Sequence, residues 1–338
     1  MKTAAVDMHC DTISALLEMR RKGTYSAGSG LSSNSLHVDL EKLEKGGCIL
    51  QNFALFVALS ACDDPFRECT ALADLYYEEL EKNKDRIRPV YHYEDIEKNR
   101  AEGKLSALLT VEEGGVCKGR LGNLRLLYRL GVRMLTLTWN FPNELGWPNV
   151  RMREKDSGAA PDFTTPDGEH GLTETGFAFL TEMERLGMIV DVSHLSDAGF
   201  WDVARTANKP FVASHSNARA VCGHVRNLGD DMIRALAEKG GVTGLNFCPS
   251  FLEEERKEGE SRGSLDAIVT HARHIVNMGG EDCLGLGSDF DGIPTNAAIP
   301  DAAHLPHLAD ALKKAGFSER QIDKIFCENV LRVYREIL

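Results

Sequence analysis

The sequence predicts a (β/α)8 barrel, a TIM barrel, formed as a single domain by residues 1–338. Three observations support this fold class: short apolar runs, amphipathic helical segments between them, and a length that such barrels commonly use as one domain. Of the 338 residues, 43% are hydrophobic and 27% are charged, so the chain can bury a large core. A doubly wound open sheet is the alternative, but a count of eight apolar runs favours the barrel.

The apolar runs have the character of parallel strands. They are nearly continuous in hydrophobic and β-branched residues, which is typical of strands buried on both faces. In chain order, the predicted strands cover residues 4–10, 48–58, 105–112, 132–139, 188–194, 211–216, 241–248 and 283–291.

The segments between these runs carry helical periodicity and helix-end signals. Segment 65–87 opens with Pro65 and places an apolar stripe on one face. Segment 173–187 has Thr173 as its predicted cap and Gly187 as its end. Further helices are expected over residues 196–209, 230–241 and 264–280, and a closing helix over 318–338 with Ser318 as its cap.

Two stretches interrupt this alternation. Residues 23–37 are rich in Gly and Ser, and residues 140–171 contain four prolines and little periodicity. We expect both to follow strands, at the barrel face where active sites are built. Loops of this length inside a compact domain are usually functional or disordered.

Composition excludes several classes of partner. The net charge of −12, from 39 basic and 51 acidic residues, disfavours nucleic acid and anionic membranes. No apolar stretch has the length of a membrane span or of a signal peptide. Nine cysteines without a CxxC pair indicate buried, reduced thiols. These features predict a soluble, cytoplasmic enzyme or binding protein.

Side chains that can bind metal close five of the eight predicted strands. Because the carboxyl ends of barrel strands converge on one face, we expect these side chains to lie together. A single strand-end His or Asp is more often a structural group, but burying six ionisable groups together is costly without a cation. The six residues are His9, Asp11, Glu112, His194, His215 and Asp289.

The chemistry of this set predicts two metal ions. His9 and Asp11 are two residues apart, so they share one face of a strand while Cys10 faces the other. Imidazole and carboxylate ligands without sulfur suit zinc, with Mn, Co or Fe as alternatives. Three histidines and three carboxylates exceed one tetrahedral ion and suit two ions bridged by a carboxylate.

The other histidines are expected not to bind metal. His271 and His274 form an HxxH pattern on a predicted helix and are expected at the surface. The rest are expected in loops or near helix ends: His37, His92, His170, His224, His304 and His307.

Six motifs spread over almost the whole chain resemble the membrane (renal) dipeptidase family, peptidase family M19, in order and spacing. They are "DMHCDT", "TVEEGG", "LTLTW", "VDVSHLS", "SHSNARAVC" and "GLGSDFDG". The resemblance implies a (β/α)8 barrel of the metal-dependent hydrolase type with a binuclear zinc centre. It also implies hydrolysis of dipeptides, often with tolerance of a D-residue on the C-terminal side. A bacterial-type, cytoplasmic member is the better match, and a homodimer is compatible with the family.

The resemblance also implies roles for the metal-binding residues. His9, Asp11 and Asp289 would bind the first zinc, and His194 and His215 would bind the second. Glu112 would bridge the two ions, since an ungapped alignment places it at the bridging position. The neighbouring Glu113 would point to the opposite face of the strand.

Three further residues would contact the dipeptide substrate. Arg226 matches the family arginine that binds the substrate carboxylate. Trp139 stands where the family has a histidine that helps to bind the scissile carbonyl, and this is the clear departure from the family. Asn140 follows Trp139 and could supply a hydrogen-bond donor in its place.

The implied mechanism is attack by a metal-bridging hydroxide on the peptide carbonyl, with Asp289 and Glu112 as catalytic groups. Asp289 would transfer the proton to the leaving amine. Three alternatives remain open: a related binuclear amidohydrolase acting on another small amide or lactone, a catalytically impaired metal-binding homologue, and a structural protein without a site.

Overall fold

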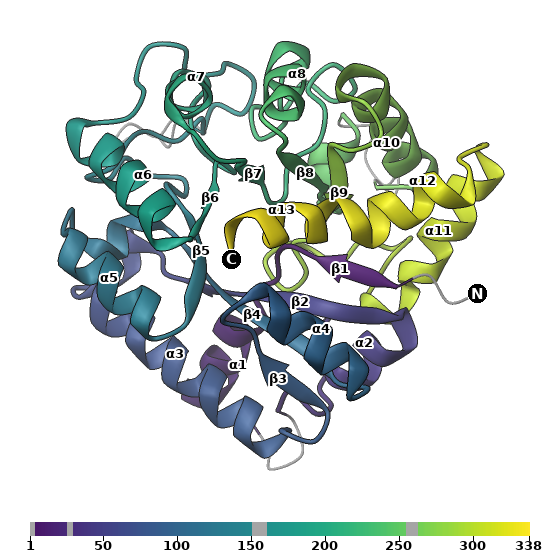
Figure 1. Cartoon of the computed structure of the whole chain (residues 1–338), viewed down its shortest axis with the longest axis horizontal. Coiled ribbons are helices and arrows are strands. Elements are labelled where there is room, and N and C mark those ends of the chain that lie inside the picture. The colour runs from purple at the N-terminus through teal and green to yellow at the C-terminus, as the bar shows by residue number, and fades with distance from the viewer. Residues whose placement is uncertain (1–3, 26–29, 151–160, 255–262) are drawn as a thin grey trace.

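The computed structural model of the chain describes residues 4–25, 30–150, 161–254 and 263–338. Its central feature is a closed barrel of parallel strands, ringed by helices (Figure 1). The strand order is β2–β1–β9–β8–β7–β6–β5–β4, and pairing between β2 and β4 closes the ring. The predicted fold class is therefore confirmed. The barrel strands are β1 (Ala5–Asp7), β2 (Cys48–Phe56), β4 (Leu105–Glu112), β5 (Val132–Thr136), β6 (Ile189–Asp191), β7 (Val212–Ala213), β8 (Val242–Leu245) and β9 (Leu284–Leu286).

One further strand lies outside the ring and was not predicted. Strand β3 (Ile87–Pro89) pairs with residues 105–107 of β4, ahead of the residues that pair with β5. The helix predicted over 65–87 therefore ends earlier, at Lys82. Three residues are too few to show a periodicity, which is why this strand left no signal in the sequence.

Helices follow the barrel strands and cover the outside of the ring (Figure 1). The predicted caps are confirmed: Thr173 and Ser318 accept hydrogen bonds from the backbone N–H groups of Gly176 and Gln321. The helices are α1 (Thr12–Arg21), α2 (Leu40–Gly46), α3 (Pro65–Lys82), α4 (Tyr93–Ala101), α5 (Leu121–Arg129), α6 (Glu174–Leu186), α7 (Asp197–Thr206), α8 (Asp230–Glu238), α9 (Pro249–Leu252), α10 (Leu265–Gly279), α11 (Leu305–Lys314), α12 (Glu319–Asp323) and α13 (Asn329–Ile337).

The last helix closes one end of the barrel. The predicted closing helix is divided into α12 and α13 by a π-helical turn over Lys324–Glu328. In Figure 1, α13 lies across the mouth of the ring. Its buried side chains, with Val330 and Tyr334 among them, complete an apolar cluster inside the barrel. The Tyr334 hydroxyl also accepts a hydrogen bond from Asn52 Nδ2 at 2.6 Å.

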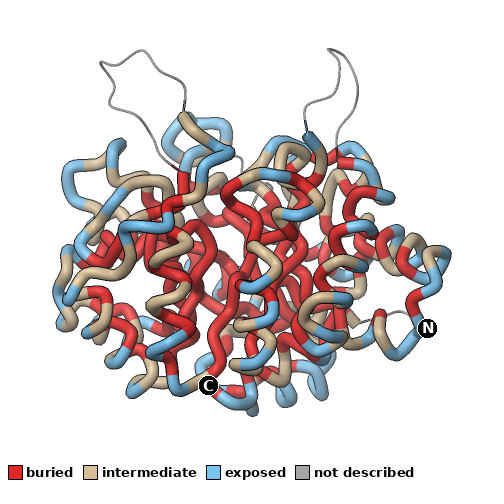
Figure 2. The backbone as a smooth tube through the Cα atoms, turned by 90° about the horizontal axis from the view of Figure 1, so that it is seen from above, coloured by how far each residue is buried: buried red, intermediate tan, exposed pale blue. Residues whose placement is uncertain are grey.

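The opposite end of the barrel is formed by loops, and buried backbone fills the space between the two ends (Figure 2). The loop over residues 140–171 follows β5 as predicted, although residues 151–160 lie outside the described part of the chain. The prediction for residues 23–37 was wrong, because this segment follows α1 rather than a strand. Its end still reaches the loop face, where the His37 N–H donates to Asp291 Oδ1 at 2.6 Å.

The close backbone contact between β8 and the residue after β7 leaves no room for a side chain at Gly244, which can be tested. A Cβ atom added at Gly244 in β8 would lie 2.0 Å from the Ser214 carbonyl oxygen, whereas one added at Gly122 in α5 would meet no atom within 4 Å. We expect Gly244→Ala to lower the free energy of unfolding by about 1–3 kcal/mol or more. Gly122→Ala should leave it unchanged or raise it by up to about 1 kcal/mol, since Ala favours helix. Urea unfolding measures both values, and equal effects would contradict the packing described.

Candidate active site

A cavity of about 550 Å³ opens at the loop end of the barrel. Residues at or just beyond the carboxyl ends of the strands line it, including Asp11 after β1, Glu112 at the end of β4, His194 after β6 and Asp289 after β9. This is the face of a (β/α)8 barrel on which active sites are built.

The six predicted metal-binding residues come together at the base of this cavity, and all six are buried. They form overlapping groups whose candidate ligand atoms lie within 4.8 Å of one another. One group holds His9, Asp11 and Glu112, a second holds Glu112, His194 and His215, and a third holds His9, His215 and Asp289.

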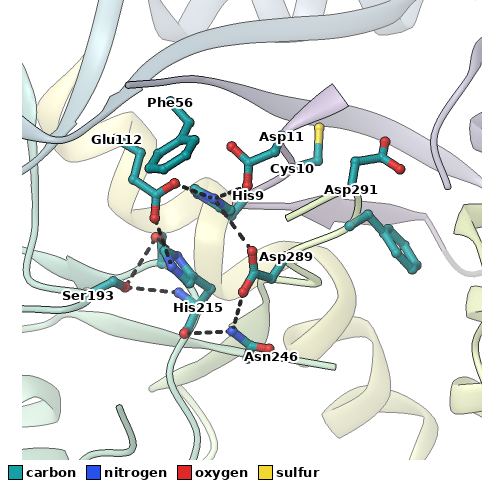
Figure 3. Close-up of polar contacts among 12 residues, drawn as sticks. His9, Cys10, Asp11, Phe56, Glu112, Ser193, His215, Asn246, Asp289 and Asp291 are labelled. Atoms are coloured by element: carbon teal, nitrogen blue, oxygen red, sulfur yellow. Dashed lines mark hydrogen bonds and ion pairs between the residues drawn. The ribbon is translucent and has the colours of Figure 1, made fainter. Parts of the chain in front are cut away.

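Glu112 belongs to two of these groups, and its two carboxylate oxygens face different partners (Figure 3). Oε1 lies 2.9 Å from His194 Nε2 and 3.5 Å from His215 Nε2. Oε2 lies 3.5 Å from His9 Nε2. A carboxylate placed in this way can bind one cation through each oxygen.

The hydrogen bonds of the second group fix its protonation. His194 Nδ1 lies 2.9 Å from Asn140 Oδ1, an acceptor, so this nitrogen carries the proton. His215 Nδ1 lies 2.7 Å from Ser214 Oγ, whose own proton goes to Asp191 Oδ2 at 2.6 Å, so the proton of His215 is also on Nδ1. Both Nε2 atoms are then acceptors, yet they lie 3.0 Å apart. Two facing acceptors at this distance repel each other, and a cation bound to both would remove the repulsion.

Burial keeps both imidazoles neutral, as metal ligands must be. It lowers the pKa of His194 to about 4, and the positive charge of Arg226 acts in the same direction. Burial also lowers the pKa of His215 well below its ordinary value.

The first group contains buried polar atoms without hydrogen bonds. Among the described residues, neither ring nitrogen of His9 has a hydrogen-bond partner, and Asp11 Oδ1 has none. Leaving such a group unsatisfied costs about 1–3 kcal/mol. Burial raises the pKa of Asp11 to about 6 and that of Asp289 to about 7. These residues therefore fit a cation, and their imidazole and carboxylate chemistry suits zinc or a similar divalent metal.

Two buried aspartates hold the segments that present His215 and Asp289. Asp191 accepts hydrogen bonds from Ser214 N–H at 2.9 Å and Ser214 Oγ at 2.6 Å. Asp7 accepts the same pair from Ser288, at 2.8 Å and 2.6 Å. In both cases the serine directly precedes the metal-binding residue. Sequence reasoning missed this arrangement, although an Asp inside an apolar strand and a Ser before each candidate ligand were visible signals.

The candidate ligands from the later strands stand beyond the strands themselves. We predicted that all six residues end their strands, but only Glu112 does, because β1 ends at Asp7, β6 at Asp191, β7 at Ala213 and β9 at Leu286. Two of the five that lie beyond their strands, His194 and Asp289, also have an unusual backbone. Both residues have positive φ angles, +70° for His194 and +63° for Asp289. Such a backbone is uncommon outside glycine and is often found at functional sites.

Glu113 anchors the loop that follows β5. It is fully buried, with φ of +99°, and no candidate metal group of the described residues contains it. Its carboxylate accepts hydrogen bonds from the backbone N–H of Trp139 at 3.1 Å and from Asn143 Nδ2 at 2.5 Å. This places the Trp139 ring on the cavity wall, 4.8 Å from the ring of Phe56. Burial raises the pKa of Glu113 to about 7.

Asn140 contacts a candidate metal ligand rather than the open cavity alone. Its Oδ1 accepts a hydrogen bond from His194 Nδ1–H at 2.9 Å, so the donor role expected for Asn140 would fall to its Nδ2 and stays a prediction. Cys10 points away from the site, as predicted from its spacing, and its thiol donates to the Asn52 carbonyl oxygen at 3.3 Å (Figure 3).

Arg226 lies in the cavity wall with a nearly unsatisfied guanidinium. The residue is only 4% exposed, and its side-chain hydrogen bonds, to Ser216 Oγ and the His215 carbonyl oxygen, are both 3.5 Å long. Burial lowers its pKa. A buried cation with free donors at the edge of a cavity is suited to bind an anionic group of a ligand.

One histidine was placed wrongly by the sequence. His271, expected at the surface, is fully buried. Its Nδ1 accepts the Ala218 N–H at 3.1 Å and its Nε2 donates to the Leu252 carbonyl oxygen at 3.0 Å. The HxxH spacing suggested an exposed helix face, but tertiary contacts give the ring a structural role. Its partner His274 is partly buried and contacts Asp230.

Comparison with known proteins assigns the family. The sequence profile described as membrane dipeptidase (peptidase family M19) matches residues 1–338. The chain belongs to this family. The M19 protein is therefore a metallo-dipeptidase, a hydrolase of peptide bonds. The structure has no helix, among the residues it describes, that is long and apolar enough to cross a membrane.

Relatives and solved structures agree with this assignment. An uncharacterised dipeptidase of Schizosaccharomyces pombe is 31% identical, over 98% of this chain and 80% of its own length. An uncharacterised Klebsiella pneumoniae protein is 36% identical, over 75% of this chain and 89% of its own length. A Rhodobacter sphaeroides metallopeptidase, solved with a phosphinate mimic of L-Ala-D-Ala, has a TM-score of 0.84 at 28% identity, with both chains fully covered.

The raised pKa of Asp289 predicts how the metal-free protein responds to pH. Its pKa is raised from 3.8 to about 7 in the fold, so between these values the folded state holds more protons than the unfolded state. The contribution of Asp289 to stability therefore falls as pH rises through this window. Asp289→Asn removes that loss. In chelator-treated samples, we therefore expect the melting temperature of the variant minus that of the parent protein to increase with pH.

When zinc is added at neutral pH, the parent protein should melt at a higher temperature than Asp289→Asn, because the Asn variant lacks a ligand for the cation. The matched control is Asp310→Asn on the exposed side of α11, outside the cavity, which should leave the melting temperature close to that of the parent. A difference for Asp289→Asn that is constant from about pH 4 to 7 would contradict the buried, cation-demanding environment described for this carboxylate.

Proposed function

We propose that this M19 protein is a dipeptidase with a binuclear metal centre, formed by a single domain over residues 1–338. His9, Asp11 and Asp289 would bind the first ion, His194 and His215 the second, and both would share Glu112. The position of Glu112 carries this proposal, since its two oxygens lie 2.9 Å from His194 Nε2 and 3.5 Å from His9 Nε2. Zinc suits the ligand set, with other divalent metals as alternatives.

Two bound divalent cations would supply polarisation of the scissile carbonyl and activation of water. The position of Asp289 at the base of the cavity suits it to transfer a proton during hydrolysis. Its Oδ2 is held by Asn246 Nδ2 at 2.8 Å, while Oδ1 lies 3.8 Å from His9 Nε2 at the cavity base. We assign to Oδ1 the transfer of the proton from the attacking water to the leaving amine. Glu112 would be the residue that both ions share.

Arg226 would bind the terminal carboxylate of the dipeptide. Its free guanidinium donors lie in the wall of the cavity whose base holds the metal-binding groups. A fixed cation beside the reacting centre selects substrates whose free carboxylate lies one residue beyond the scissile bond, as it does in a dipeptide. Acceptance of a D-residue on the C-terminal side is part of the proposal, supported by the L-Ala-D-Ala mimic bound to the Rhodobacter relative.

The alternative of another binuclear amidohydrolase, acting on a small amide or lactone, would use the same ions but would not need Arg226. A cytoplasmic location is proposed from the reduced state of the cysteines, eight of which are buried. A homodimer stays a prediction.

Metal removal tests the proposed function directly. We expect chelator-treated protein to lose hydrolysis of a panel of L-Xaa-L-Xaa and L-Xaa-D-Xaa dipeptides, and to recover it as zinc is restored to two ions per chain. Metal content by plasma emission and product amino acids by chromatography are the two readouts. Full activity after complete metal removal, or no cleavage of any dipeptide by the fully loaded protein, would contradict the proposal.

The role of Arg226 makes a separate prediction. Arg226→Lys keeps the charge but loses the planar pair of donors, so we expect the KM for dipeptides to rise at least about tenfold. The KM for dipeptide amides, which lack the carboxylate, should change much less. Arg234→Met, on an exposed face of α8, is the control. If the variant discriminates dipeptides from their amides as the parent does, Arg226 does not bind the carboxylate.

A further inference from the structure

One wall of the cavity consists of stacked rings beside Arg226. Phe163 and His224 are stacked with ring centroids 5.2 Å apart, and His224 lies 4.4 Å from Phe251. The guanidinium of Arg226 lies 5.6 Å from the centre of the Phe251 ring. All four residues line the cavity. Of these, Phe163 is a large apolar side chain that stays 42% exposed although its ring stacks on His224.

Backbone hydrogen bonds fix this wall in place. Arg226 N–H donates to His224 Nδ1 at 3.1 Å, and Val225 N–H donates to the Phe163 carbonyl oxygen at 2.8 Å. The short segment 224–226 is thus joined both to the backbone of Phe163 and, through the His224 ring, to the backbone of Arg226.

The first of these hydrogen bonds also determines the tautomer of His224. Since Nδ1 accepts a backbone proton, the ring proton of neutral His224 is on Nε2. Burial lowers the pKa of His224 to about 4, and the charge of Arg226 adds to the effect, so the ring is neutral near pH 7. Among the described residues, Nε2 has no hydrogen-bond partner. His224 therefore offers one free N–H donor at the cavity wall. It lies two positions before Arg226 in the sequence, and both residues line the cavity.

We propose that His224 is a second contact for the terminal carboxylate of the substrate, and that Phe163 and Phe251 bind the apolar side chain of its C-terminal residue. This inference rests on the proposed dipeptidase function and narrows it to a substrate class: dipeptides whose C-terminal residue is apolar or aromatic. The carboxylate lies between Arg226 and the Nε2–H of His224, and the side chain lies against the rings.

The donor and the ring can be tested separately. His224→Phe keeps a ring for stacking but removes both the Nε2–H donor and the Nδ1 acceptor of the Arg226 N–H. We therefore expect the KM for L-Ala-L-Ala to rise at least about tenfold, the size of one hydrogen bond to a charged group. His224→Gln keeps an N–H donor and should recover most of this loss. For L-Ala-L-alaninamide, which lacks the carboxylate, the two variants should have similar KM values. Metal content and melting temperature show that each variant is folded and loaded.

The apolar subsite is tested with a second variant and a second substrate. Phe163→Ala should raise the KM for L-Ala-L-Phe by about tenfold, because an aromatic contact surface is lost, and should leave the KM for L-Ala-Gly within about twofold. His307→Phe, an exposed change on α11 outside the cavity, is the control matched to His224→Phe and should behave as the parent with every substrate.

The outcomes separate this inference from the proposed function. If the parent cleaves no dipeptide, the proposed function fails. If the parent cleaves dipeptides but folded, metal-loaded His224→Phe retains the parent KM for L-Ala-L-Ala, the role of His224 is wrong. If Phe163→Ala affects L-Ala-Gly and L-Ala-L-Phe equally, the aromatic wall does not bind the side chain.

Discussion

The arrangement of the site depends on the carboxylate of Glu112. It is buried at the end of β4, with Oε1 turned toward His194 and His215 and Oε2 toward His9. Without a cation, the Nε2 atoms of His194 and His215 are two acceptors only 3.0 Å apart, beside a carboxylate oxygen that is also an acceptor. These acceptors repel one another, and a cation bound between them would replace the repulsion with attraction. The fold therefore holds a group of side chains that is suited to bind metal.

Hydrogen bonds within the barrel hold the segments that carry these side chains in fixed positions. Asp191 holds Ser214 next to His215, and Asp7 holds Ser288 next to Asp289. The second pair joins β1 to the segment after β9, so two residues 281 positions apart in the sequence meet beside the site. Glu113 does the same for the loop after β5 through its hydrogen bond to the Trp139 backbone. Such supporting contacts orient metal ligands and their loss commonly weakens metal binding about 10–100-fold.

Sequence reasoning could predict the barrel and the meeting of the six polar residues, because strand periodicity and the convergence of strand ends are properties of the chain pattern. It could not predict β3, which is too short to have a period, or the burial of His271, which depends on contacts with Ala218 and Leu252. The placement of His194 and Asp289 beyond their strands also escaped prediction, since a positive φ has no signal in these residue types. The role proposed for His224 required knowing which atom its Nδ1 contacts.

The most direct test of the account is the anomalous scattering of zinc in crystals of the zinc-loaded protein. If two ions share Glu112, two peaks should lie about 3.5–4 Å apart, one next to each of its carboxylate oxygens. The first peak should lie beside His9 and Asp11, and the second beside His194 and His215. A single peak, or two peaks of which neither adjoins Glu112, would contradict the claim that this carboxylate is shared by two ions.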